Sequence, residues 1–595
     1  METLFFNITI LVSIIWGLLF FVFAGLGFFI RRLFGLKINK VEDFFISFWL
    51  GWAISVAFLQ IWHLFLKIDW RAFCLVAVLG AIGLFLNRDG IRHIVKGKGY
   101  KNWLYCLIFL LTVLWLANRV ILPPSIYDTG LYHLPSIRWA MAFPIVPGLG
   151  NLSGFLAYNS SHFLYVAMLS FKIGPLAQET YRLANGLLML ALFGQIFLSY
   201  FRLFTNVQEQ RVYHVFNSLL LLPALFEILT VNISNPTPDI PAFVLSLVLS
   251  GQLLAFLENV DFPSNENRYM LFFIAALSAV AITIKQGLIV MGLVSLLILI
   301  LKAKKMLSWV VASSIIILLF WVIRGVMLSG YVAYPIPFGS FPVEWRVPYA
   351  NVVDMANGVR AWGRVPLTMD YDKVLGSWDW FIPWVGHIFR NPKVVMSLTW
   401  LFIGCFLMLI FRFTKIHKQE LRKTMCQFLL PSVVSIAAWF MIAPEPRYLG
   451  GHLWVVGAGT VAINISCFNI SEGKKKLQMV FGYYLILFCT LCLTLPKTRC
   501  FKTGGMAMVL ERLHIKGAPI FGPGTNHDFY RTPSVELKIF KTNSGLVIYV
   551  PKNEYQCWNA PLPCAGYPNA ELALRKKGQL YSGFVINKEQ IRGRD

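Results

Sequence analysis

The sequence predicts an all-α polytopic membrane protein of about fourteen transmembrane helices, with interfacial helices in its outer loops and a small C-terminal extracytoplasmic α/β domain. Three observations support this fold class. The 595 residues are 57% hydrophobic and only 14% charged, which is too apolar for an ordinary water-soluble protein. Apolar runs long enough to cross a bilayer recur along the chain. Beyond residue 495 the apolar runs stop and polar residues become frequent.

The predicted spans come first. The longer apolar runs lie at 5–30, 41–62, 103–120, 181–201, 212–232, 240–257, 307–327, 395–413, 427–443, 451–468 and 478–495. Three shorter runs, at 71–86, 269–284 and 286–301, bring the expected number to about fourteen. The first run is longer than a signal-peptide core and follows no basic segment, so we expect it to remain as the first span.

Lysine and arginine clusters predict the orientation, because basic loops are retained on the cytoplasmic side. Each cluster falls in an alternate connection between the predicted spans. Both termini are then extracytoplasmic, as are the long connections at 121–180 and 328–394. The net charge of +25 does not indicate nucleic acid as a partner, because the basic residues form short clusters between apolar runs rather than one continuous groove.

The chain divides into a transmembrane domain at 1–495 and a soluble extracytoplasmic domain at 496–595. In the second, alternating residues from Val535 to Ile539, a turn at 543–545 and an apolar run at 546–550 predict a β-hairpin. Cys557 and Cys564 follow in a proline-rich loop. Because the predicted compartment is oxidising, we expect them to form a disulfide; a zinc site is the alternative, although no second Cys or His pair accompanies them.

Two carboxylates stand where outer connections meet predicted spans. Asp128 follows a span in the segment 123–139, with Tyr127, His133 and Arg138 nearby. Asp239 precedes another span in a proline-rich segment. A loop acid can simply be solvated, and Asp239 can cap the following helix. His133 and Arg138 could support Asp128 and contact a phosphate, although a single histidine is more often structural.

Three cations reach the same predicted face. Lys285 occupies a tight turn between two spans, Arg324 ends a span, and Arg447 precedes Tyr448 at another junction. Each alone could be an interfacial anchor. Together they suit a phosphate at headgroup depth, with Asp128 as general base toward an acceptor hydroxyl. Asp239 would orient the acceptor or bind a divalent metal ion.

At these residues the sequence resembles the GT-C superfamily of integral membrane glycosyltransferases, which includes bacterial aminoarabinose transferases and protein mannosyltransferases. The matching motifs are Asp128, Asp239, Lys285-Gln286-Gly287, Arg324 with the segment 329–335, and Arg447-Tyr448. The resemblance covers most of residues 100–500. Asp128 lacks the second acid that several relatives carry beside it, and the Cys557–Cys564 tail is not a general feature of the superfamily.

The resemblance implies a GT-C-like helical bundle and an inverting transfer of a hexose or pentose from a polyprenyl-phosphate sugar. The acceptor would be a lipid, a surface glycan or a protein, at the outer face of a bacterial inner membrane. Three alternatives stay open. One is an O-antigen ligase or polymerase type enzyme with a lipid pyrophosphate donor. Another is a transporter or flippase for lipid-linked sugars, which should carry ionisable residues near the bilayer midplane. The third is a non-catalytic assembly or receptor protein with an outer domain, in which Asp128→Asn and Arg447→Ala would leave activity untouched.

Overall fold

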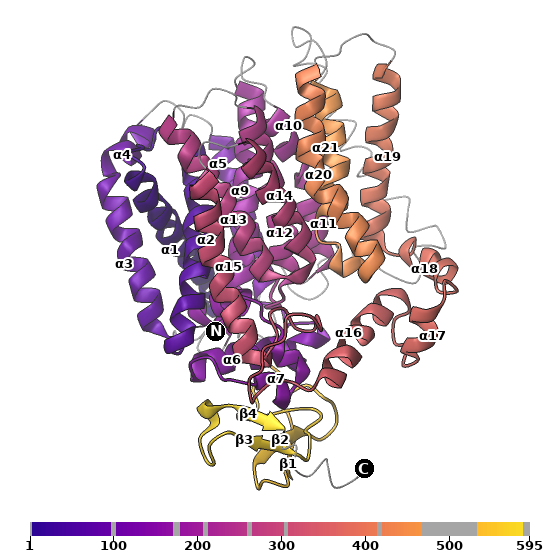
Figure 1. The fold of residues 1–595 in the computed structure, drawn as a ribbon. Helices are drawn as coiled ribbons and strands as arrows, with labels where there is room; N and C mark the ends of the chain where they lie inside the picture. The colour runs from indigo at the N-terminus through magenta and orange to yellow at the C-terminus, as the bar shows by residue number, and fades with distance from the viewer. Residues whose placement is uncertain are drawn as a thin grey trace.

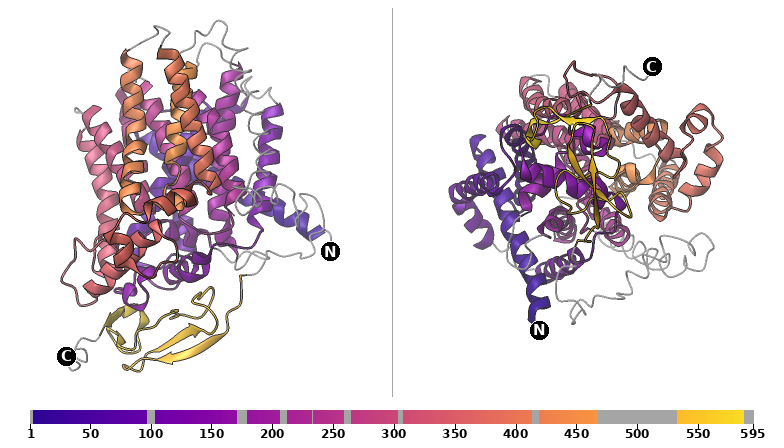
Figure 2. Two further views of the ribbon diagram at one scale, coloured as in Figure 1. Left: turned by 90° about the vertical axis from the view of Figure 1, so that its right-hand side faces the viewer. Right: turned by 90° about the horizontal axis from the view of Figure 1, so that it is seen from below.

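The structure is a computed structural model, and it describes residues 3–96, 103–170, 179–205, 212–231, 233–258, 264–302, 307–412, 419–466 and 532–586. Long helices lie side by side and form the body of the molecule (Figure 1). A layer of short helices covers one end of this bundle, and four β-strands lie beyond that layer. Seen from that end, the strands lie across the centre of the bundle (Figure 2).

The elements follow the chain in this order. The helices are α1 (Thr3–Leu33), α2 (Glu42–Phe65), α3 (Trp70–Leu86), α4 (Arg88–Lys96), α5 (Trp103–Val120), α6 (Leu134–Ala142), α7 (Leu149–Leu152), α8 (His162–Leu169), α9 (Leu183–Thr205), α10 (Val212–Leu219), α11 (Leu221–Thr230), α12 (Asp239–Glu258), α13 (Ser264–Ile284), α14 (Ile289–Lys302), α15 (Leu307–Ser329), α16 (Tyr349–Arg364), α17 (Tyr371–Gly376), α18 (Phe381–Ile388), α19 (Pro392–Arg412), α20 (Gln419–Ile442) and α21 (His452–Ser466). Single-turn elements are η2 (Thr129–His133), η3 (Gly154–Ala157), η5 (Thr180–Arg182), η7 (Gln286–Leu288), η9 (Pro446–Tyr448) and η13 (Leu580–Ser582). The strands are β1 (Leu537–Lys541), β2 (Val547–Pro551), β3 (Leu572–Leu574) and β4 (Phe584–Ile586).

Among the described residues, seven helices are long and apolar enough to cross a membrane, or eight if α3 and α4, which meet at a 63° bend, count as one span. In five further helices the apolar stretch found among the described residues is 10–17 residues long. The predicted number of about fourteen is therefore not confirmed. The predicted span at 478–495 lies outside the described residues. The basic helix α4 lies at the end of the bundle opposite the β-strands (Figure 1). Which of these two ends faces the cytoplasm stays a prediction.

Small residues let the first three helices approach closely. A Cβ atom added to Gly25 of α1 would lie 2.2 Å from the carbonyl oxygen of Gly80 in α3. One added to Gly27 would lie 1.9 Å from the carbonyl oxygen of Ser47 in α2. Backbones can pack this tightly only where side chains are absent, as is common between helices in membranes. These glycines therefore hold the α1–α2–α3 unit together.

The C-terminal strands form two antiparallel pairs. Strands β1 and β2 pair from Leu537 with Pro551 to Lys541 with Val547, which confirms the predicted hairpin. Gly545 supplies the positive φ of +82° at its turn, a conformation that glycine adopts without steric cost. Strands β3 and β4 form the second pair, and β4 contacts α7 of the outer layer. The described part of this domain, residues 532–586, is thus fastened to the outer loops of the bundle.

Candidate active site

Four charged residues from distant parts of the chain are positioned by helix ends and tight turns. Asp128 directly precedes η2, and Asp239 is the first residue of α12. Lys285 lies between α13 and η7, and Arg447 lies in η9, between α20 and α21. The surrounding helices therefore fix the backbone position of each of these four residues.

These four side chains form one charge cluster of two ion pairs. Arg447 Nη1 lies 2.9 Å from Asp128 Oδ2, and Lys285 Nζ lies 2.5 Å from Asp239 Oδ1. The pairs touch, because Lys285 Nζ also donates to the Arg447 carbonyl oxygen at 3.3 Å. The ring of Tyr448 lies within 5.2 Å of Lys285 Nζ and 5.3 Å of Arg447 Cζ, in range of a cation–π contact. The structure thus brings together four of the five charged residues that the sequence indicates.

Exposure differs across the charge cluster. The Arg447 side chain is 41% exposed, whereas those of Asp128, Asp239 and Lys285 are 18%, 20% and 15% exposed. Burial by itself would lower the pKa of Arg447, but the nearby Asp239, Tyr448 and Asp128 outweigh it and raise that pKa above its ordinary value. Arg447 is therefore a permanent cation, and it is the member of the cluster that an approaching anion reaches most easily.

An asparagine that the sequence analysis left without a role ties the two carboxylate loops together. Asn235 Oδ1 accepts hydrogen bonds from the backbone N–H groups of Ser125 at 2.9 Å and Ile126 at 3.1 Å. It also accepts one from Thr129 Oγ1 at 3.2 Å. Asn185 Nδ2 in turn donates to the Asn235 carbonyl oxygen at 2.7 Å. The proline-rich segment before Asp239 therefore holds the segment that carries Asp128. Its sequence signal is only an asparagine among prolines.

Buried aromatic and imidazole rings line the inner side of the charge cluster. Burial raises the pKa of Tyr132 well above its ordinary value, and Asp128 adds to that shift. Burial also lowers the pKa of His133 to about 3, although Asp239 opposes the shift, and it lowers that of His162 to about 3 as well. Both imidazoles are therefore neutral at pH 7. His133 is thus a buried, neutral imidazole close to Asp239.

The C-terminal domain packs directly on the Asp128 segment. The backbone N–H of Trp558 donates to the Gly130 carbonyl oxygen at 3.0 Å, and Gln556 Nε2 donates to the Tyr127 carbonyl oxygen at 2.6 Å. Arg138 donates to the Ala560 carbonyl oxygen. Two of the predicted supporting residues, Tyr127 and Arg138, thus contact the C-terminal domain. The other two, His133 and Tyr448, lie close to the charge cluster, as described above.

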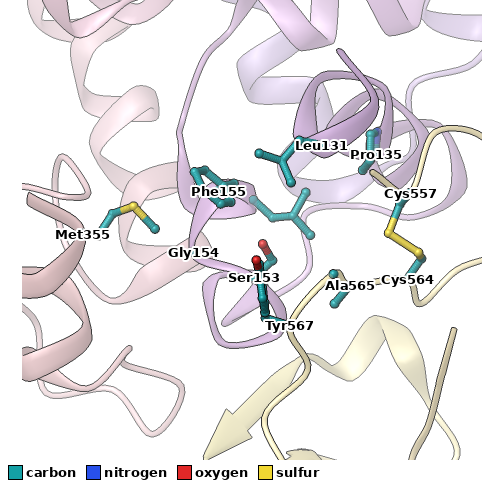
Figure 3. Close-up of a pocket in the computed structure, with 12 residues that line it drawn as sticks. Leu131, Pro135, Ser153, Gly154, Phe155, Met355, Cys557, Cys564, Ala565 and Tyr567 are labelled. Carbon is teal, nitrogen blue, oxygen red and sulfur yellow. A yellow bond between two sulfur atoms is a disulfide. The ribbon is translucent and has the colours of Figure 1, made fainter. Parts of the chain in front are cut away.

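The predicted disulfide is confirmed and closes the loop that makes these contacts. Cys557 and Cys564 are joined by an S–S bond of 2.05 Å. Beside this disulfide, a cavity of about 180 Å³ opens between the Asp128 segment, η3 and α16. Figure 3 shows side chains from all of these elements around it, with the disulfide on one side and Met355 on the other. Leu131, Pro135 and Tyr567 also line the cavity. It lies beside the Leu131 and Pro135 side chains of the Asp128 segment, on the side of the C-terminal domain.

Arg324, the fifth charged residue, lies elsewhere. Its side chain is buried in α15, and Nη1 lies 2.6 Å from Nδ1 of His63 in α2. Among the described residues, the ion pairs of the charge cluster do not include it. The expectation that all five charges share one contact network therefore does not hold for Arg324, because its helix turns the side chain toward α2.

A metal ion was one of two expected partners of Asp239. Within the described ranges, no group of three or more His, Cys, Asp or Glu side chains gathers as a metal site requires. Asp239 instead binds Lys285, and Asp128 binds Arg447. Both carboxylates thus have cationic side chains where a metal ion would lie, and we derive no step through a metal.

The comparisons with known proteins concern the whole chain. No curated protein and no solved structure matches the chain. One family model does match, and it covers residues 9–454. That range includes all four residues of the charge cluster and nearly all of the helical bundle, and it ends before the C-terminal strands. The chain therefore belongs to the family described as a domain of unknown function, DUF8201.

Proposed function

We propose that this protein is an inverting membrane glycosyltransferase that moves a sugar from a polyprenyl-phosphate donor to an acceptor hydroxyl at the extracytoplasmic face of a bacterial inner membrane. The observation that supports this most is the charge cluster itself. It combines a carboxylate, two cations and a second carboxylate at one end of an apolar helical bundle. A lipid-linked donor presents its phosphate at the level of such a helix end.

The chemistry assigned to the charge cluster is a single displacement. Asp128 accepts the proton of the acceptor hydroxyl, and the hydroxyl oxygen attacks the anomeric carbon of the donor sugar. The bond between that carbon and the phosphate oxygen breaks, and the polyprenyl phosphate leaves with the electron pair. Arg447 and Lys285 stabilise the charge that develops on the phosphate. Asp239 orients Lys285 and the acceptor.

Donor binding and base activation are linked in this proposal. Arg447 pairs with Asp128, so the guanidinium occupies a hydrogen-bonding position on this carboxylate. A phosphate that draws the 41% exposed Arg447 toward itself weakens this pair. Asp128 is then free to accept a hydrogen bond from the acceptor hydroxyl when the donor is in place. The acceptor, a glycan, lipid or protein, would approach through the cavity beside the disulfide.

Reconstitution of the full chain in liposomes tests this function. The liposomes contain a panel of polyprenyl-phosphate hexoses and pentoses with candidate acceptors, and release of polyprenyl phosphate is followed by mass spectrometry. Asp128→Asn should lower turnover by about 100-fold to 10,000-fold, the usual contribution of a general base. Glu536→Gln is the matched control. Glu536 also pairs with a cation, Lys552, but it lies in the C-terminal domain just before β1 and is not part of the charge cluster.

Two results would contradict the proposal. Equal turnover by the wild type and Asp128→Asn would remove the carboxylate from catalysis. Binding of the lipid-linked sugars without turnover, by both proteins, would instead indicate a carrier. Loss of turnover in Glu536→Gln as well would show only that the fold is sensitive to carboxylate removal.

A further inference from the structure

A second charged site lies apart from the charge cluster, around Arg324. This side chain is only 4% exposed, and its Nη1 donates to Nδ1 of His63 at 2.6 Å. His63 Nε2 lies 3.2 Å from the Phe143 carbonyl oxygen, so Nε2 carries the proton and Nδ1 accepts from the guanidinium. The histidine is therefore a neutral partner. Among the described residues, no carboxylate forms an ion pair with Arg324.

A small cavity of about 30 Å³ lies beside this guanidinium. Arg324 and His63 line it together with Ser136 and Trp139 of α6. Three polar atoms of these lining residues are buried without a hydrogen-bond partner: Arg324 Nε, Ser136 Oγ and Trp139 Nε1. Trp139 is only 3% exposed. None of the described residues that line the cavity is an aspartate or a glutamate.

The unpartnered polar atoms of this lining can all act as hydrogen-bond donors. Arg324 Nε and Trp139 Nε1 can only donate hydrogen bonds, and the Ser136 hydroxyl can do so. Buried donors that lack an acceptor, and a buried cation that lacks a counter-charge, are both costly arrangements. An ion that accepts several hydrogen bonds and carries a negative charge would satisfy all of these groups at once. A water molecule would satisfy some of the donors but would leave the charge of Arg324 uncompensated.

The size of the cavity restricts which anion fits. A cavity needs roughly 10 to 15 Å³, measured in this way, to hold one water molecule. A volume of about 30 Å³ therefore has room for a monatomic anion. We propose that Arg324, Trp139 and Ser136 bind one chloride-sized anion in this cavity. This site does not depend on the proposed transferase function.

Thermal unfolding of the detergent-purified full chain tests the proposal. Tm is measured in sodium chloride and in sodium gluconate at equal ionic strength, so that only the small anion differs. Chloride should raise Tm by about 2 °C or more, because a ligand that binds only the folded state stabilises it. Trp139→Phe keeps an aromatic ring but removes the indole N–H, and it should remove most of this rise.

Two further variants make the test specific. Trp345→Phe is the matched control, because the Trp345 indole donates to the Val326 carbonyl oxygen and does not line the cavity; it should keep the full chloride effect. Asp128→Asn should keep it too, which separates this site from the charge cluster. Arg324→Gln should abolish the effect if the variant folds, and Trp139→Phe decides the matter if it does not.

Crystals grown in sodium bromide provide a direct view. An anomalous difference peak beside Arg324 Nε and Trp139 Nε1 is the expected result. Three outcomes would overturn the proposal: identical Tm values in chloride and gluconate, an unchanged chloride effect in Trp139→Phe, or a cavity without a bromide peak. A rise in Tm with farnesyl phosphate but not with chloride would also overturn the proposal, because the ligand would then be a lipid phosphate.

Discussion

The contact between Gly130 and Trp558 gives the sharpest prediction about how the C-terminal domain supports the charge cluster. A Cβ atom at Gly130 would lie 2.4 Å from Trp558 Cε2 and 2.6 Å from Nε1. Gly130→Ala must therefore push the indole away. The indole cannot move freely, because the residue that carries it is fixed at its backbone. The backbone N–H of Trp558 donates to the Gly130 carbonyl oxygen at 3.0 Å, and the disulfide closes the loop that contains Trp558.

The expected cost follows from these two effects. Forcing an extra methyl group into a packed contact costs about 1 to 3 kcal/mol, and loss of the hydrogen bond adds about 1 kcal/mol. Gly130→Ala should therefore lower the free energy of unfolding by about 2 to 4 kcal/mol. Because Asp128 lies two residues before Gly130, any transfer activity should fall as well. Tryptophan fluorescence during thermal unfolding of the detergent-purified protein measures the first effect.

A double variant tests the cause. Trp558→Ala removes the clashing ring, so Gly130→Ala should cost almost nothing more in that background, and the two effects should be far from additive. Gly386→Ala is the control, because no atom lies within 4 Å of an added Cβ there; it should leave stability unchanged or slightly higher. Additive effects of Gly130→Ala and Trp558→Ala, or a Gly130→Ala protein as stable as the wild type, would refute the reasoning.

Two further predictions concern the titratable residues around the site. The pKa values of His133 and His162 lie at about 3, below the ordinary value of 6.5, so their contribution to stability is present above pH 6.5 and is lost as the pH falls toward 3. Between pH 7 and 5.5 each should cost about 1 kcal/mol, and His162→Leu should flatten the plot of Tm against pH; an unchanged slope would contradict this. Lys285→Met should destabilise the protein by about 2 kcal/mol, because it leaves a largely buried carboxylate at the start of α12 without its cation. Denaturant unfolding measures this loss of stability. The loss should be smaller when Asp239→Asn is added, because no unpaired carboxylate then remains.

Local sequence patterns predicted the parts of the fold that depend on local physics. The hairpin followed from alternating side chains and a glycine turn, and β1 and β2 pair across that turn. The disulfide followed from two cysteines in a proline-rich outer loop. The number of spans was harder to predict, because hydropathy does not show where a helix bends or stops short. Helices α3 and α4, for example, meet at a 63° bend.

The charge cluster shows both the reach and the limit of the sequence. Its four members share a recognisable position, at the end of an apolar run on one predicted side, so their meeting could be expected before any contact was known. Arg324 has the same sequence signature, yet it donates to His63. Direction around a helix axis separates the two cases. Hydropathy locates a residue along a span but carries little information about which neighbour it faces. Asn235 was missed for a related reason, since the three hydrogen bonds described for its side-chain oxygen join segments about 110 residues apart.

The balance of charge within the cluster constrains how it can act. Two carboxylates and two cations neutralise one another, so the cluster attracts a distant anion only weakly before binding. A phosphate that binds Arg447, the most exposed of the four, would compete with Asp128 for it. A neutral molecule gains nothing from that exchange, because it offers Arg447 no charge in place of the carboxylate. If the site acts on lipid-linked sugars, selection for a phosphate and release of the base are therefore one event.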